Sequence, residues 1–311
     1  MIRKLAHDEI AADLATVDSL LQSIPEDDVL GRVGFEARRG RLAHSLFELE
    51  ALPEAHAGAA LVFAGDPVKG ALGIRSGFAG GALALYQDMV AKVLAQRARG
   101  NLGQRGVVPH REAATLHLTN VMRGSFGFVL EELEGDGQEP MFATELKSAV
   151  DETARLIACF ADEDDERFTA ALVDSDPRVF DALGEFFKLV RANGALFRLV
   201  SGNLDMNFTN RAVEVAAERA AVTHLAEAEE ELTGDLQGVL PEAHRFEFRT
   251  SPQGDIINGA VSSEITSENL LNLNRTLSGR RVRARMWVRK IERQGKSPHV
   301  SYVLLSAEAD G

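Results

Sequence analysis

The sequence feature that most constrains the fold is a run of short, alternating apolar segments in the last part of the chain. Residues 232–240, 245–249 and 256–261 predict three strands, because apolar and polar side chains alternate between turn residues. Residues 268–277 predict a helix with Ser267 as its N-cap. Residues 282–288 and 301–305 predict two further strands. The order is therefore three strands, one helix and two strands.

This order predicts a small all-β barrel over residues 228–311. A helix between the third and fourth of five strands is the arrangement of an oligonucleotide/oligosaccharide-binding (OB) barrel. Gly234 and Gly238 lie inside the first strand, which is typical of a strand that bends as a barrel closes. An SH3-like barrel is the alternative, because the number of strands alone does not determine the topology.

The first 227 residues predict a body in which several helices accompany short antiparallel strands. Residues 1–50 predict a helical lead-in, residues 58–133 a core of strands and a helix, and residues 143–227 a mostly helical segment. The clearest helix is 177–193, with Asp176 as its cap, Pro177 at its first position and Gly194 at its end. The acidic run 227–231 predicts a bridge to the barrel. The fold class is thus α+β.

Composition restricts the setting in which the chain works. Arginine greatly outnumbers lysine, and alanine and glycine are abundant, which is typical of a bacterial chain from a GC-rich genome. One cysteine, Cys159, cannot form an internal disulfide, and no apolar run is long enough to cross a bilayer. The start of the chain lacks the apolar core of a secretory signal. These features predict a cytoplasmic protein with no membrane partner.

The charge is unevenly distributed between the two predicted domains. Residues 241–311 hold 11 basic and 8 acidic residues, a charge of +3, and the other 240 residues hold 23 basic and 39 acidic residues, a charge of −16. An acidic body repels polyanions over a distance, whereas a basic domain can still bind one.

The motifs of nucleotide, metal and nucleophile chemistry do not occur. Neither the P-loop motif G-x-x-x-x-G-K-[ST] nor the dinucleotide motif G-x-G-x-x-G is present. The eight histidines lack the spacing of metal ligands, and the nucleophile elbow G-x-S-x-G of hydrolases does not occur. Cys159 lies in a predicted helix without a neighbouring base and is interpreted as core packing. Glu145 and Lys147 match half of a nuclease motif, but at a helix start. We therefore predict no catalytic residue, metal or cofactor.

Two groups of basic residues are the candidate sites. The first is the glycine-rich loop 97–111, which suits an anion such as a phosphate. Its basic residues are Arg97, Arg99, Arg105 and Arg111. The alternative interpretation is a surface loop without a ligand.

The second candidate site is the outward face of the predicted strand 282–288. Alternation places the apolar residues Val282, Ala284, Met286 and Val288 on the core side and the arginines on the other. The candidate interface residues are Arg281, Arg283, Arg285, Trp287, Arg289 and Lys290. An arginine row with a tryptophan suits single-stranded nucleic acid, and it equally suits a protein interface.

The leading hypothesis is a non-enzymatic binding or scaffold protein of a bacterial cytoplasmic assembly that forms homo-oligomers. Its partner would be an acidic protein surface or its own subunits. The first alternative is a nucleic-acid-binding protein that uses the Arg/Trp face. The second is an enzyme acting on a phosphorylated ligand at the loop 97–111. The strands that usually form the binding face of such a barrel carry no outward aromatic residue, which favours the protein partner.

Overall fold

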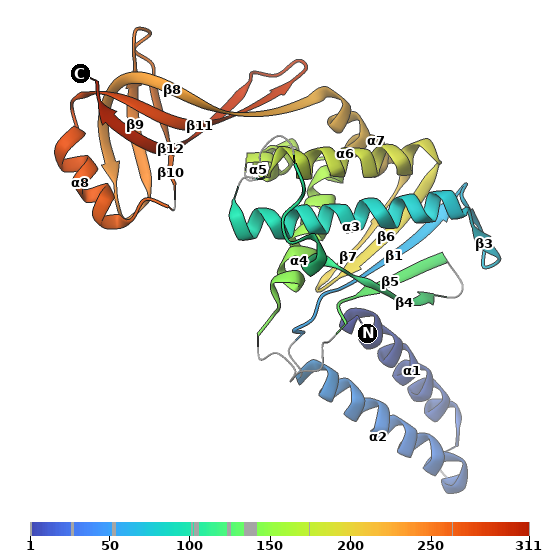
Figure 1. The fold of residues 1–311 in the computed structure, drawn as a ribbon. Coiled ribbons are helices and arrows are strands. Elements are labelled where there is room, and N and C mark those ends of the chain that lie inside the picture. Colours follow the sequence, from blue (N-terminus) through green and yellow to red (C-terminus); the bar gives the residue numbers. More distant parts are fainter. Residues whose placement is uncertain are drawn as a thin grey trace. The chain divides into compact units, whose positions relative to one another are not determined.

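The computed structural model describes residues 2–25, 28–51, 54–100, 102, 106–122, 126–133, 142–173, 175–262 and 264–310. The described chain divides into two compact units. The first comprises Met1–Phe168 and Asp181–Arg219, and the second Thr169–Phe180 and Ala220–Gly311. The described residues combine helices and sheets, so the α+β class expected from the sequence is confirmed (Figure 1).

The first unit is built on an antiparallel sheet with the strand order β4-β5-β1-β6-β7. Its strands are β1 (Gly58–Gly65), β4 (His117–Met122), β5 (Phe126–Glu131), β6 (Ala195–Ser201) and β7 (Leu204–Phe208). The central strand β1 is an apolar run in which Ala59, Ala60, Leu61 and Phe63 are fully buried. Such a continuous run is expected of a strand that is covered on both faces. Two short strands, β2 (Val68–Lys69) and β3 (Gly73–Ile74), form a separate two-stranded sheet.

Helices provide the rest of the first unit and run into the second. They are α1 (Arg3–Ser23), α2 (Val29–Ala51), α3 (Ser76–Arg99), the short 3-10 helix η1 (Arg111–Ala114), α4 (Glu145–Ala161), α5 (Asp165–Val173), α6 (Pro177–Ala192) and α7 (Asn210–Val222). The predicted helix 177–193 is confirmed as α6, where the backbone N–H of Arg178 donates to Asp176 at 2.8 Å. Gly194 follows α6 with a φ of 58°, a conformation that favours glycine.

Phenylalanine side chains attach α3 and α6 to one face of the sheet. The rings of Phe63 on β1 and Phe78 on α3 lie 5.1 Å apart, edge to face. Phe186 on α6 makes a similar contact with Phe197 on β6, at 5.4 Å. The opposite face of the sheet packs against the start of α1, where Ile2 is 2% exposed. Edge-to-face rings add to the free energy of burial, so these contacts stabilise the layer of helices on the sheet.

The second unit contains a five-stranded sheet that closes on itself in the order β10-β12-β11-β8-β9. The strands are β8 (Thr223–Leu240), β9 (Arg245–Thr250), β10 (Ile256–Val261), β11 (Arg281–Arg293) and β12 (His299–Ala309), with α8 (Ser267–Leu277) between β10 and β11. Only the β10–β12 pairing is parallel among the pairings of this sheet that the structure describes. Each of the five strands and α8 overlaps the segment that the sequence predicts for it, and β8 begins well before its predicted start.

The core of the closed sheet is the set of inward side chains that the alternation predicts. Val282, Ala284, Met286 and Val288 on β11 are at most 1% exposed, and Leu270 of α8 is fully buried with them. Glycine is required where strands approach closely. A Cβ on Gly234 would lie 2.1 Å from the carbonyl oxygen of Arg249, and one on Gly259 would lie 2.1 Å from that of Tyr302. No other residue fits at these two positions.

Three sequence-based expectations are corrected. The acidic run 227–231 is not a bridge but part of β8, which starts at Thr223 and pairs along its length with β11. The expected boundary between residues 227 and 228 therefore falls inside a strand. The N-cap of α8 is Thr266, whose hydroxyl accepts from the N–H of Asn269, and not Ser267. β7 is a strand that the sequence analysis did not predict within the mostly helical segment, although Leu204–Phe208 alternates apolar and polar residues with the period of a strand.

Candidate interface on the barrel strands

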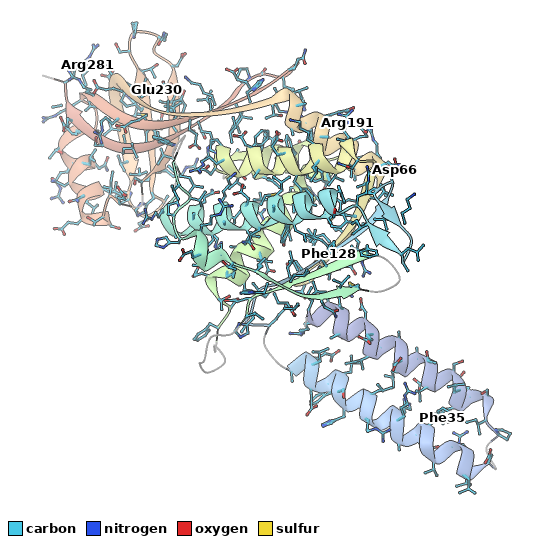
Figure 2. All side chains as sticks on the ribbon, turned by 45° about the vertical axis from the view of Figure 1, so that its right-hand side comes forward. Phe35, Asp66, Phe128, Arg191, Glu230 and Arg281 are labelled. Carbon is cyan, nitrogen blue, oxygen red and sulfur yellow. The ribbon has the colours of Figure 1, made fainter. Side chains whose placement is uncertain are left out.

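The outward face of β11 carries the predicted arginine row. Burial alternates along the strand, and the side chains of Arg281, Arg283 and Arg285 are 60%, 56% and 57% exposed. Trp287 is half-buried, and Arg289 is only 15% exposed. The predicted alternation is confirmed over residues 281–288. Arg281 is labelled in Figure 2.

Glutamates of β8 lie directly beside this row. The register places Glu231 opposite Arg285, Glu229 opposite Trp287 and Glu227 opposite Arg289. Because side chains alternate on both strands, the three glutamates and the three residues of β11 share one face. The acidic run that the sequence analysis assigned to a bridge thus forms the second half of the arginine face.

The ion pairs run diagonally across this face. Arg283 lies 3.3 Å from Glu231, and Arg285 lies 3.2 Å from Glu229. Asp310, which follows β12, lies 3.4 Å from both Arg281 and Arg283. Every arginine of the row therefore has a carboxylate partner within the same unit. We name these residues of β8, β11 and the C-terminal segment the ion-pair ladder: Arg281, Arg283, Arg285, Arg289, Glu227, Glu229, Glu231 and Asp310.

The ladder becomes buried toward Arg289. Glu227 is 4% exposed and accepts a hydrogen bond of 3.0 Å from the indole N–H of Trp287 and another from the guanidinium of Arg289. Arg289 also donates to the backbone carbonyl of Val173. Exposed ion pairs contribute about 0–1 kcal/mol each, but breaking a buried pair costs about 3–5 kcal/mol. The Glu227 end therefore holds β8 and β11 in register, and the exposed end stabilises them little.

Lys290, the last of the predicted interface residues, interrupts the alternation. Its ammonium group lies 2.6 Å from Glu230, which is labelled in Figure 2, and this hydrogen bond raises the pKa of Lys290. Lys290 and Glu230 lie on the same two strands as the ladder, but each is one residue away along its strand from a ladder residue. Lys290 is thus paired too, and it is not available as a free cation.

The strands β9 and β10 form a second exposed surface of the closed sheet. Arg245, Glu247 and Arg249 point outward on β9, as the alternation predicts. Beside them a groove of about 590 Å³ lies near the C-terminal end of α8, lined by Gln237, Gly238, Val239, Leu240, Arg245, Phe246, Glu247, Asn258, Asn274 and Ser278. Phe246 belongs to the core at 3% exposure, so it offers no ring for stacking on a base.

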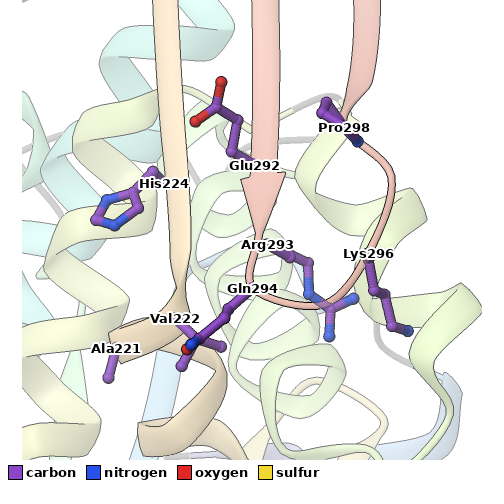
Figure 3. Close-up of a pocket in the computed structure, with 8 residues that line it drawn as sticks. All are labelled: Ala221, Val222, His224, Glu292, Arg293, Gln294, Lys296 and Pro298. Atoms are coloured by element: carbon purple, nitrogen blue, oxygen red, sulfur yellow. The ribbon is translucent and has the colours of Figure 1, made fainter.

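A hollow of about 590 Å³ lies beside the turn between β11 and β12 (Figure 3). Its lining residues are Ala221, Val222, His224, Glu292, Arg293, Gln294, Lys296 and Pro298. His224 stands opposite Glu292 in the strand register, and burial lowers the pKa of Arg293. A guanidinium nitrogen of Arg293 lies 3.5 Å from the hydroxyl of Thr169. The charged residues that line this hollow are of both signs, as they are in the ladder.

The basic residues of the loop 97–111 have different partners. Arg97 lies 4.0 Å from Glu145 on α4, and Arg111 lies 3.2 Å from Asp88 on α3. Arg99 contacts the imidazole of His110 at 3.4 Å. Arg105 lies outside the described residues. Two of the three described arginines are thus bound to carboxylates of different helices.

The two other residues considered for catalysis, Lys147 and Cys159, have structural environments. Lys147, half of the nuclease-like pair, is 8% exposed at its side chain and bound to Asp151 at 2.6 Å and Glu54 at 3.2 Å. Burial raises the pKa of Cys159, which keeps it as a thiol. In the described part of the chain, no three His, Cys, Asp or Glu side chains are placed to hold a metal ion. Likewise, no described helix has the length and apolarity to span a membrane.

Comparison of the chain with protein-family models, with curated proteins and with solved structures finds no match. The residues that the sequence analysis missed are the glutamates of β8. Their signal was present, since Glu227, Glu229 and Glu231 are spaced by two, the period of a strand face. The dense negative charge favoured a loop and concealed this period.

Proposed function

We propose that the chain is a non-enzymatic binding or scaffold protein that uses its C-terminal unit as a protein-docking module. The observation that carries the proposal is the ion-pair ladder, in which each outward arginine of β11 already has a carboxylate partner. The closed sheet also supports an OB-like topology over an SH3-like one, because α8 lies between the third and fourth strands and the third and fifth strands pair in parallel.

A polyanion is a poor partner for the ladder. Its phosphates would have to displace Glu229 and Glu231 from Arg283 and Arg285, and those carboxylates would remain on the same face and repel it. A protein surface of mixed charge can instead exchange ion pairs with the ladder without leaving unpaired charge. Two partners were expected, an acidic protein surface and the chain's own subunits. The same reasoning favours the subunits over a uniformly acidic surface.

An enzyme that acts on a phosphorylated ligand is less well supported. Such a site gathers several cations around one anion, whereas Arg97 and Arg111 are held by Glu145 and Asp88. The assignment to a cytoplasmic bacterial assembly rests on composition and remains part of the proposal.

The first experiment measures oligonucleotide binding by fluorescence anisotropy as a function of salt. We expect the wild type to bind a labelled single strand weakly, with little salt dependence. The double variant Glu229→Gln and Glu231→Gln removes the glutamate partners of Arg285 and Arg283 and leaves Asp310 beside Arg283. It should gain binding with a steeper slope of about 0.7 per phosphate contact. Tight, strongly salt-dependent binding by the wild type would instead support the nucleic-acid alternative and refute the docking module.

The second experiment tests the docking surface with the triple variant Arg281→Ala, Arg283→Ala and Arg285→Ala. We expect loss of co-purifying proteins or a change in oligomeric state, with fold stability nearly unchanged because the three side chains are exposed. The matched control replaces three exposed arginines of the first unit, Arg155, Arg167 and Arg211, with alanine. An effect of equal size in the control would mean that net charge, and not the ladder, controls association.

A further inference from the structure

Helix α2 has two apolar faces, and among the described elements its main packing partner is α1. One face carries Phe35, Leu42, Leu46 and Leu49, which are half-buried against α1 (Phe35 is labelled in Figure 2). No residue of α2 is fully buried. The other face is exposed, and its residues follow one another at intervals of three and four: Leu30, Val33, Ala37, Gly40, His44 and Phe47. We call this second face the outer stripe.

The outer stripe has the spacing of a coiled-coil seam. Intervals of three and four residues keep side chains on one line of a helix over several turns, which is the pattern of positions that meet a second helix. Leu30, Val33 and Phe47 are 91%, 55% and 68% exposed. Single exposed apolar residues need no explanation, but six positions in seam register, three of them large and apolar, point to a partner helix.

The order of residue sizes along the stripe identifies the partner. From either end it runs from large to intermediate to small: Leu30 and Phe47 are outermost, Val33 and His44 are next, and Ala37 and Gly40 are central. An antiparallel copy of α2 would therefore meet Leu30 with Phe47, Val33 with His44 and Ala37 with Gly40. A surface that matches itself under a two-fold rotation is the requirement for a symmetric dimer.

Two of the three glycines of α2, Gly34 and Gly40, contact nothing in the chain's own packing, whereas Gly31 lies against Asp28. A Cβ added to Gly34 or to Gly40 would meet nothing within 4 Å. Glycine inside a helix costs about 0.5–1 kcal/mol relative to alanine, so an interior glycine without a packing reason is unexpected. At Gly40, the centre of the outer stripe, a missing side chain lets a second helix approach closely. α2 is nevertheless continuous through both Gly34 and Gly40.

Charge also favours a second copy of the chain. Val29–Ala51 contains four arginines and three glutamates, whereas the whole chain carries −13. Arg38 and Arg39 are directed to α1, where they lie 2.9 Å from Asp13 and 2.6 Å from Asp18. Two copies of α2 therefore meet without the repulsion that most other surfaces of so acidic a chain would produce.

We propose that the outer stripe pairs antiparallel with the outer stripe of a second copy, so that the two α1–α2 hairpins form a four-helix arrangement. The stripe extends over 18 residues, a length of about 27 Å at 1.5 Å per residue. A single helix pair of this length is a small interface, so the dimer should depend on protein concentration. The inference rests on the self-association in the proposed function, and it adds a second contact between subunits that is separate from the ion-pair ladder.

Sedimentation equilibrium of Gly40→Gln and Gly34→Gln tests the pairing. Glutamine is a better helix former than glycine, so both variants should keep or increase the helical circular dichroism of the full chain. We expect the dimer dissociation constant to rise by at least about tenfold for Gly40→Gln, where the side chain blocks the seam, and to change little for Gly34→Gln at its edge. A monomeric wild type, or equal dimers in both variants, would overturn the proposal.

Cysteine cross-linking tests the orientation of the two helices in a Cys159→Ser background. An equimolar mixture of Leu30→Cys and Phe47→Cys chains should form mixed disulfides, whereas each chain alone should cross-link poorly. Efficient cross-linking of Leu30→Cys to itself would indicate a parallel pair and would refute the antiparallel stripe. Because these variants leave the ladder intact, retained partner capture by the barrel with a failed dimer would separate this inference from the docking function.

Discussion

The indole N–H of Trp287 on β11 donates a hydrogen bond of 3.0 Å to the carboxylate of Glu227 on β8. Glu227 also accepts from Arg289, and it is 4% exposed. A carboxylate this deeply buried is stable only where donors surround its oxygens. For this contact to form, β8 must begin well before residue 232, where the apolar alternation predicts its start. The contact also attaches the acidic run 227–231 to β11.

We expect Glu227→Ala to destabilise the second unit by about 3 kcal/mol, because it leaves the guanidinium of Arg289 without its carboxylate in a buried position. Trp287 is the only tryptophan in the chain, so its fluorescence reports this unit selectively. Denaturant unfolding followed at the tryptophan should move to lower denaturant, with a red-shifted native spectrum. The control Glu229→Ala removes an exposed partner and should change stability by less than about 1 kcal/mol. Equal effects of the two variants would contradict the burial argument.

The extent of β8 predicts how the barrel must be excised. A fragment of residues 220–311 keeps the pairing of β8 with β11 from Thr223 to Asp235, whereas 228–311 lacks Glu227 and the strand residues before it. We expect the longer fragment to unfold cooperatively with a β-rich circular dichroism spectrum. The shorter fragment should be measurably less stable, by the cost of the lost Glu227 pair. If the two fragments are equally stable, the early part of β8 contributes nothing to the fold.

The sequence predicts most elements of this fold, because periodicity reports burial on one face. The inward side chains of β11 and the caps around α6 follow directly from local pattern. Pairing between strands is not local. Nothing near Arg283 or Arg285 in the sequence indicates that Glu231 and Glu229 lie beside them, more than fifty residues earlier. The sequence alone therefore predicts the arginine row as a basic surface. The carboxylates that neutralise it are identified only from the register of β8 and β11.

Arg198 and Asp205 form a two-pronged ion pair across β6 and β7, with distances of 2.7 and 2.6 Å. The hydrogen bonds from Arg198 lower the pKa of Asp205 in the folded chain, and partial burial opposes them. A lowered folded-state pKa means that the stabilisation is complete above the unfolded value of about 3.9 and is lost as pH falls through the folded value. Asp205→Asn should thus cost about 1 kcal/mol at pH 7, and progressively less below about pH 4.

Hydrogen exchange of the β6 and β7 amides provides the measurement for this pair, because it reports local opening in a chain of two units. The control is Glu163→Gln, which removes a pair with Arg211 whose side chains are 71% and 72% exposed. It should have little effect at any pH. A cost of Asp205→Asn that stays constant from neutral to acidic pH would show that shape, and not charge, holds the pair.

Arg219 on α7 holds the end of α4 through a buried guanidinium. The residue is 8% exposed, donates to the carbonyl oxygens of Phe160 and Glu163 at 3.3 and 3.2 Å, and lies 4.8 Å from the ring centre of Phe168. Carbonyl groups at the end of a helix lack partners within the helix, and a cation there also interacts favourably with the helix dipole. One planar group thus satisfies several acceptors at once.

We expect Arg219→Met to destabilise the first unit by about 3 kcal/mol, because similar volume is kept while the buried carbonyl oxygens lose their donors. Arg219→Lys should recover only part of this loss, since an ammonium group cannot span the carbonyl oxygens as the planar guanidinium does. The control Arg167→Ala removes a side chain that is 70% exposed and should change stability by about 0.5 kcal/mol or less. Thermal unfolding followed by far-ultraviolet circular dichroism compares the three variants. A full rescue by lysine would mean that charge alone matters at the end of α4, and that the fork of hydrogen bonds does not.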